Sequence, residues 1–177
     1  MYRRNLHAKR YGDVESREKP SILSAKFWPA VSGASKLGYA FLPLLVGHVF
    51  VNRVIPKGST GGSSNINLSY VSHAFARHPI ISYVGFIALI TVGVSHITWG
   101  WAKWLNLTPD HVSGMGPEGK MIRKRRRNVI NGLSALIAGL WMAGGFGIIG
   151  RAGAAPGYVG RMYDQMYRKI PLIGSWM

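Results

Sequence analysis

Three long apolar runs, separated by polar and charged segments, dominate the pattern of this chain. The clearest extends from Ile80 to Ala102 and contains no Lys, Arg, Asp or Glu. At about 1.5 Å per residue, a helix of this length crosses the roughly 30 Å hydrocarbon core of a bilayer. The run ends in three tryptophans and a lysine, residue types that are typical of the headgroup region of a membrane: Trp99, Trp101, Lys103 and Trp104. The pattern predicts a membrane-spanning helix over residues 80–104.

Two further runs have the same character, at residues 31–55 and 128–150. Pro43 interrupts the first, and a span tolerates such a kink where neighbouring groups satisfy the freed carbonyl. The second follows directly on a cluster of cations. We therefore predict an all-α fold, an integral membrane helical bundle with three transmembrane helices in a membrane domain over residues 28–150.

Short amphipathic segments flank these spans. The charged residues 1–27 predict a disordered basic tail. Leu68, Val71 and Phe75 fall on one face of a helix, with His73 elsewhere, which indicates either a short interfacial helix or a structured loop. Residues 151–177 form a C-terminal interfacial tail, in which apolar positions recur every fourth residue: Tyr158, Met162, Met166 and Ile170.

Composition narrows the class of protein further. The formal charge is +16, from 22 Lys and Arg against 6 Asp and Glu. A nucleic-acid binder has a similar charge, but it does not need three charge-free apolar runs, so we expect no nucleic-acid partner. The absence of Cys excludes a thiolate metal site and a cysteine nucleophile. No HExxH, GxSxG or phosphate-binding loop occurs, so we expect a non-enzymatic protein without a metal.

The cations that precede the third span are the clearest electrostatic feature. They attract anionic lipid headgroups at about 1 kcal/mol each, and they also act as a topology anchor. The positive-inside rule places them, with the N-terminal tail, on the cytosolic side. The cluster consists of Lys120, Arg123, Lys124, Arg125, Arg126 and Arg127.

Small residues recur every fourth position along the third span. This small-xxx-small pattern lets another helix approach closely. Its partner is either one of the chain's own spans or another polypeptide, so homo- or hetero-oligomers are both open. The predicted helix-packing residues are Ala135, Gly139, Ala143 and Gly147.

Histidines within or beside the spans are candidate haem b ligands. His48 and His96 lie on successive antiparallel spans at depths that differ by about 15 Å, so these two cannot hold one iron. His73 and His78 lie closer to the depth of His48, and a second subunit is another source of ligands. The alternative is that these histidines are hydrogen-bonded structural residues and that no cofactor binds.

Several stretches resemble a fungal family, the transmembrane domain of a mitochondrial outer-membrane contact adapter. They are LPLLVGHVFVNRVIP, HAFARHPIISYVGF, GVSHITWGWAKWL, NGLSALIAGLWMAGGFGIIGRAG and GYVGRMYDQMY. The resemblance implies a multi-pass protein of the mitochondrial outer membrane that supports lipid homeostasis at membrane contact sites. It also implies an adapter that recruits a bridge-like lipid-transfer protein through a Pro-x-Pro motif in the N-terminal tail, where this chain has only the isolated Pro20 and Pro29.

A second likeness offers a different function. GVSHITWGWAKWL is similar to a stretch of the cytochrome b membrane anchor of succinate dehydrogenase, which implies a b-type haem or quinone-binding anchor in electron transfer. In this chain Ser95 and Gly100 stand where that family has Arg and Asp, and Leu89 stands where it has an axial His.

Overall fold

The computed structural model describes residues 31–59, 62–114, 116–171 and 174. The chain divides into residues 1–32 and a second unit formed by residues 33–177. The predicted tail of residues 1–27 lies outside the described residues. Every regular element in the described part of the chain is a helix, which confirms the all-α prediction.

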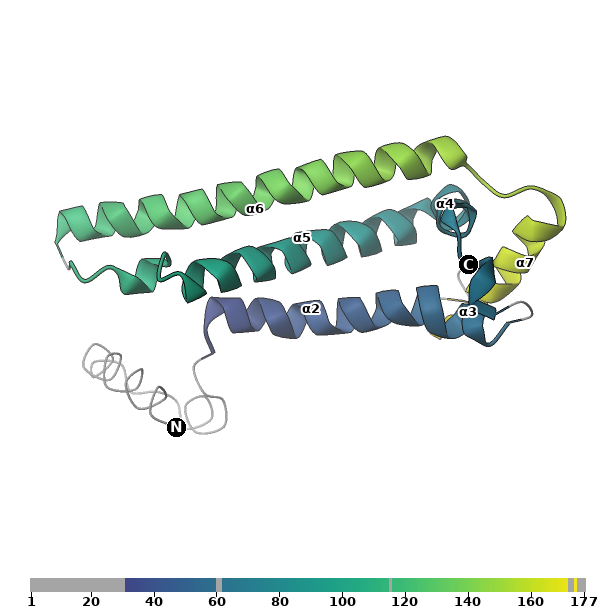
Figure 1. Ribbon diagram of the computed structural model, residues 1–177, viewed down its shortest axis with the longest axis horizontal. Coiled ribbons are helices and arrows are strands. Elements are labelled where there is room, and N and C mark those ends of the chain that lie inside the picture. The colour runs from purple at the N-terminus through teal and green to yellow at the C-terminus, as the bar shows by residue number, and fades with distance from the viewer. Residues whose placement is uncertain (1–30, 60–61, 115, 172–173, 175–177) are drawn as a thin grey trace. The chain divides into compact units, whose positions relative to one another are not determined.

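The second unit is built around α5, Pro79–Trp104, which lies between α2, Gly33–Val49, and α6, Pro117–Ala152 (Figure 1). α5 has 26 residues and is about 39 Å long, and Pro79 fits its first turn because no intrahelical N–H is needed there. Three helical segments are long and apolar enough to cross a membrane: 33–57, 79–111 and 117–152. The three predicted spans are therefore confirmed.

The first span continues beyond α2 as a π-helical segment, η1 (Phe50–Val54), and a short helix α3 (Ile55–Lys57). The Ile55 N–H bonds to the carbonyl of Phe50, five residues earlier. The next hydrogen bond of this five-residue spacing would join the carbonyl of Val51 to the N–H of residue 56, but residue 56 is a proline and has no N–H. The Val51 carbonyl is thus left without a helical partner, a feature that the sequence analysis did not predict.

Glycines allow α2 and α5 to approach closely. A Cβ atom at Gly93 would lie 2.7 Å from the Phe41 ring, and one at Gly38 would lie 2.9 Å from the His96 ring. His96 Nδ1 lies 3.0 Å from the Ala34 carbonyl oxygen. Because that oxygen only accepts, Nδ1 carries the proton and the imidazole bridges the two helices.

α6 packs against α5 through the face that carries Ile130, Ser134 and Ala138, which are buried. The Trp99 Nε1–H donates to Asn131 Oδ1 at 3.0 Å and joins the two helices. The small-residue stripe lies on the exposed side of α6, so the chain's own spans do not cover it, and packing against another polypeptide stays a prediction. The stripe comprises Ala135, Gly139, Ala143 and Gly147.

Two short helices cover one end of the second unit: α4, Leu68–Arg77, and α7, Gly157–Tyr167 (Figure 1). The segment of α4 is thus a helix rather than a loop, and the expected C-terminal helix is also present. Most of the expected apolar positions face inward, since Phe75 and Met166 are buried. Leu68 is 49% exposed and Tyr158 is 72% exposed, whereas His73 is buried. Single turns of 3-10 helix, η2 (Gly62–Asn65) and η3 (Pro109–His111), complete the described connections.

Candidate functional site

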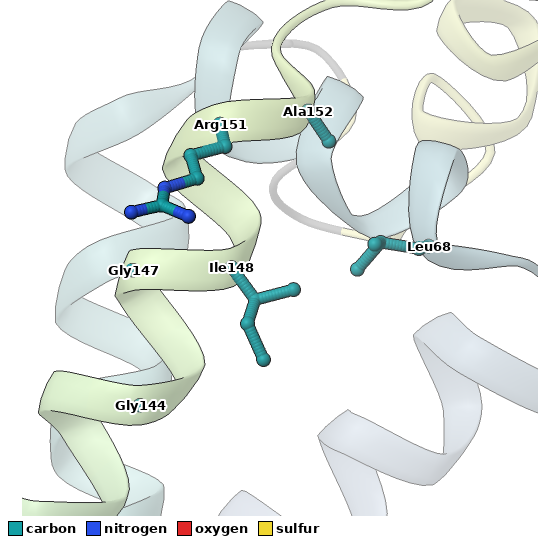
Figure 2. A pocket seen from close by; sticks show the side chains of 6 residues that line it. All are labelled: Leu68, Gly144, Gly147, Ile148, Arg151 and Ala152. Atoms are coloured by element: carbon teal, nitrogen blue, oxygen red, sulfur yellow. The ribbon is translucent and has the colours of Figure 1, made fainter.

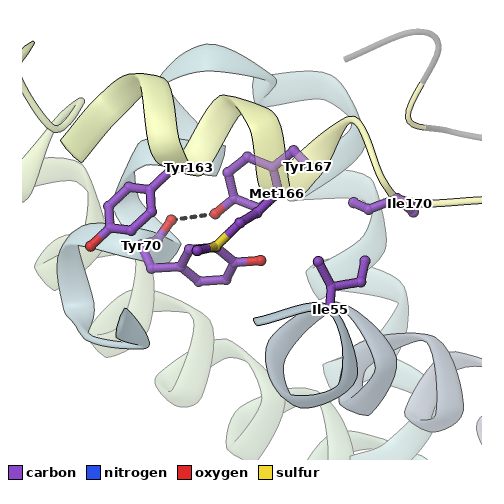
Figure 3. Packing of buried hydrophobic residues seen from close by; sticks show 6 residues of the cluster. All are labelled: Ile55, Tyr70, Tyr163, Met166, Tyr167 and Ile170. Carbon is purple, nitrogen blue, oxygen red and sulfur yellow. Dashed lines mark hydrogen bonds between the residues drawn. The ribbon is translucent and has the colours of Figure 1, made fainter. Parts of the chain in front are cut away.

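A buried aromatic cluster joins α4 and α7 to the end of the first span (Figure 3). The Tyr70 ring stacks on that of Tyr167, with centroids 4.8 Å apart, and meets the Tyr163 ring edge-on at 5.2 Å. Polar side chains accompany these rings. We call the following residues the capping cluster: Asn67, Tyr70, His73, Tyr163, Asp164 and Tyr167.

His73 is 2% exposed, and both of its ring nitrogens have partners. Nε2 lies 2.9 Å from Asp164 Oδ1, and the backbone N–H of Ala155 donates to Nδ1 at 3.1 Å. Because a backbone amide only donates, Nδ1 holds a lone pair and the proton sits on Nε2. A neutral imidazole therefore links α4 to the carboxylate of α7 and to the segment that precedes it.

The Asp164 carboxylate is the acidic member of the capping cluster. Burial acts to raise its pKa, but the hydrogen bond from His73 and the nearby positive charge of Arg77 outweigh burial, so the pKa lies below its usual value. The Arg77 Nε atom lies 3.8 Å from Oδ1. The carboxylate is therefore ionised and serves as an acceptor between the two helices.

The tyrosine hydroxyls make three further hydrogen bonds, one from α4 to the end of the first span and two between α7 and the α4 segment. Tyr70 donates to the free carbonyl of Val51 at 3.0 Å, and Tyr163 donates to Asn67 Oδ1 at 3.2 Å. The Tyr167 hydroxyl donates to the backbone carbonyl of Tyr70. Burial raises the pKa of Tyr70 to about 12, so its hydroxyl remains a donor at neutral pH.

The cation cluster lies within the first turns of α6, because this helix begins at Pro117 rather than at residue 128. Two of its members brace the α5–α6 loop. Arg123 donates to the carbonyls of Val112 and Gly114, and Arg126 donates to that of Asn106. The other four are exposed, and we call them the basic face: Lys120, Lys124, Arg125 and Arg127.

Of the four residues in the basic face, only Lys120 lies near the first turn of α6. The N-terminal turns of a helix carry partial positive charge, which favours anions rather than Lys or Arg. Glu118 is the one acidic residue in the first turn of α6. An external anion at this surface would therefore be favoured by the side chains, and by the helix dipole only beside Lys120.

The four candidate haem ligands lie in three separate places. His48 meets the Phe86 ring and lies 3.3 Å from Asn52 Nδ2, whereas His96 binds α2 as described above. His73 and His78 both lie beside Tyr167. Within the described residues, His78 Nε2 is a buried nitrogen without a hydrogen-bond partner, and no group of three or more His, Asp or Glu could hold a metal ion.

The sequence analysis did not predict the pairing of His73 with Asp164. The two residues are 91 positions apart, so no local spacing connects them. The available signal was the spacing of Tyr163, Met166 and Tyr167 in α7, which marks a buried helical face beside the acid.

The described residues define a helical membrane protein with three spans, a basic surface before the third span and a polar aromatic cluster at the opposite end of that span. A family model described as MDM10-complementing protein 1, transmembrane domain, matches residues 43–154. The chain belongs to this family, which confirms the first resemblance and identifies a mitochondrial membrane protein. No curated protein and no solved structure matches the chain.

Proposed function

We propose that this chain is a non-enzymatic protein of the mitochondrial outer membrane that supports lipid homeostasis and organelle contact. The observation that carries the proposal is the family match over residues 43–154, which covers part of the first span and the whole of the second and third. The adapter role for a bridge-like lipid-transfer protein belongs to the same proposal. The basic face supports it, because four exposed cations before a span suit a surface rich in anionic headgroups.

The family description suggests a direct test of this function. A fungal cell that lacks MDM10 is transformed with the full chain, and its growth and mitochondrial lipid composition are measured. Rescue of both supports the proposal. A chain that reaches mitochondria at normal abundance without restoring either would contradict it. Protease treatment of intact mitochondria adds the location, because outer-membrane loops on the cytosolic side are cleaved without rupture of the organelle.

The basic face provides a matched pair of variants. Replacing Lys120, Lys124, Arg125 and Arg127 with Gln should reduce the enrichment of anionic lipid around the purified protein, by about 1 kcal/mol for each charge. Replacing Arg161, Arg168 and Lys169 with Gln removes exposed cations at the other end of α6. An equal loss of enrichment per charge in this comparison variant would show that cations in general, and not the basic face, attract the lipid. If glycosylation mapping shows inverted topology in the first variant with unchanged lipid enrichment, the basic face is an anchor and not a lipid site.

The electron-transfer alternative predicts a different property of the same material. A b-type haem would give the detergent-purified chain a Soret band that His96→Ala abolishes. We expect a colourless protein, because His73 already uses both ring nitrogens and the four candidate histidines lie in three separate places. A Soret band in the folded chain would overturn this expectation.

A further inference from the structure

An open groove lies at the C-terminal end of α6, where this helix passes α4 (Figure 2). Its volume is about 530 Å³, within the roughly 300–1,000 Å³ that is typical of ligand sites. The groove is about 20 residues beyond the basic face, or about 30 Å along α6, so it belongs to the opposite surface of the membrane. It is lined by Leu68, Gly144, Gly147, Ile148, Arg151 and Ala152.

The glycines of the groove do not serve packing inside the chain. A Cβ atom at Gly144 or at Gly147 would meet no atom within 4 Å, so the space beside the backbone is open. Figure 2 shows the side chains of Ile148 and Leu68 extending into the gap between α6 and α4. This gap has an apolar wall on both sides and a bare helix backbone beside it, a shape that accommodates an unbranched hydrocarbon chain.

Arg151 places a charge at the edge of this apolar groove. The Cα–Cβ bonds of a helix tilt toward its N-terminus, so a side chain in the last turn of α6 is directed back toward the bilayer. In Figure 2 the guanidinium extends toward the turn that holds Gly147. Among the described acids, Asp164 is held in the capping cluster, and Asp110 and Glu118 lie near the opposite end of α6. The cation therefore has no carboxylate partner in the described part of the chain.

We propose that this groove binds one phospholipid, with an acyl chain along Gly144 and Gly147 and the phosphate on Arg151. A guanidinium presents a planar pair of donors that matches two phosphate oxygens. A second copy of the chain fits less well, because each copy would bring its own Arg151 cation, without a carboxylate partner among the described residues, into the contact. The site requires that α6 spans a bilayer, and it does not depend on the proposed adapter role.

Photo-crosslinking of the full chain in vesicles of digalactosyldiacylglycerol, a bilayer lipid without phosphate, tests this site. One probe is a trace of phosphatidylglycerol with a diazirine in its acyl chain, and the other is diacylglycerol with the same chain and no phosphate. Mass spectrometry locates the adducts. We expect phosphatidylglycerol to label the groove around Ile148 and Leu68. Arg151→Gln should lower this labelling about tenfold, as the loss of one charge-assisted hydrogen bond implies, and leave diacylglycerol labelling unchanged.

Matched variants separate the groove from the helix surface in general. Gly147→Leu fills the groove and should reduce labelling by both probes. Gly132→Leu adds the same side chain at another exposed, open glycine of α6 and should reduce neither. Arg161→Gln removes an exposed cation outside the groove and should also have no effect.

Three results would overturn the site: labelling that Arg151→Gln does not lower, equal groove labelling by the two probes, or crosslinks between two chains in place of lipid adducts. If Gly147→Leu fails to fold, Arg151→Gln still decides, because the guanidinium is exposed and has no hydrogen-bond partner among the described residues. The vesicles contain no partner protein, so failure of the adapter role leaves this result unchanged.

Discussion

Replacing His73 with Ala should release α7 from α4 while the three spans stay packed. The imidazole is 2% exposed and connects two helices that are distant in sequence. Its removal leaves Asp164 without its closest donor and leaves the Ala155 N–H without an acceptor. The spans are held together by other groups, including the Trp99 indole between α5 and α6.

The size of the effect follows from the two hydrogen bonds. A bond to a charged carboxylate contributes about 1.5–3 kcal/mol, and a bond between neutral groups contributes about 1 kcal/mol. Their loss therefore destabilises the docked state by about 3 kcal/mol. Since about 1.4 kcal/mol corresponds to a tenfold change in an equilibrium constant, the undocked population should rise about 100-fold.

Hydrogen exchange with mass spectrometry measures this opening in detergent or in lipid nanodiscs. Amides of α7, Gly157–Tyr167, should exchange about 100-fold faster in His73→Ala, and amides of α5 should keep their protection. His111→Ala is the matched control, because His111 is an exposed histidine near the opposite end of α6. Unchanged α7 exchange, or equal loss of protection in every helix, would refute the reasoning.

Two further changes test the packing of α2 and the charge of α7. Gly93→Ala places a Cβ atom 2.7 Å from the Phe41 ring and should destabilise the fold by about 1–3 kcal/mol in thermal unfolding. Gly85→Ala adds the same atom in open space and should not destabilise it. Equal thermal unfolding midpoints for the two variants would contradict this contact. The pKa of Asp164 lies below its ordinary value of 3.8, so the ionised carboxylate stabilises the docking of α7 on α4 fully above about pH 4. This stabilisation is lost as the pH falls below that value. Proteolysis of α7 should therefore accelerate only in acid, and Asp164→Asn should abolish that dependence; an unaltered acid profile would exclude Asp164 as its source.

The spans could be predicted because lipid imposes a length and an apolar composition that the sequence shows directly. The predicted second span, residues 80–104, differs from α5 by one residue at its start. The third helix begins earlier than predicted, at Pro117, because an apolar pattern marks the depth of the bilayer and not the end of the helix. Lys and Arg are good helix formers, so α6 extends through the cations into the aqueous surface.

The capping cluster could not be predicted, because its contacts join segments that no local period connects. The expected apolar face of α4 contained Leu68, which is half exposed, and it excluded His73, which is buried. A buried imidazole is tolerated here because Asp164 and a backbone amide satisfy both nitrogens. The Val51 carbonyl likewise accepts from Tyr70 only because a π-helical turn beside Pro56 leaves it without a helical N–H partner. No sequence pattern marks such a turn.

The capping cluster and the proposed lipid groove both include residues of α4. Leu68 forms one wall of the groove and begins the helix that His73 links to α7, whereas Arg151 belongs to α6. If α4 moves away when its link to α7 is broken, the apolar wall is lost while the cation stays in place. His73→Ala should then reduce acyl-chain labelling at Ile148 by both lipid probes, unlike Arg151→Gln, which should affect only the probe with a phosphate. A groove that keeps its labelling while α7 exchanges freely would show that α4 is held by its contacts with α5 and α6 alone.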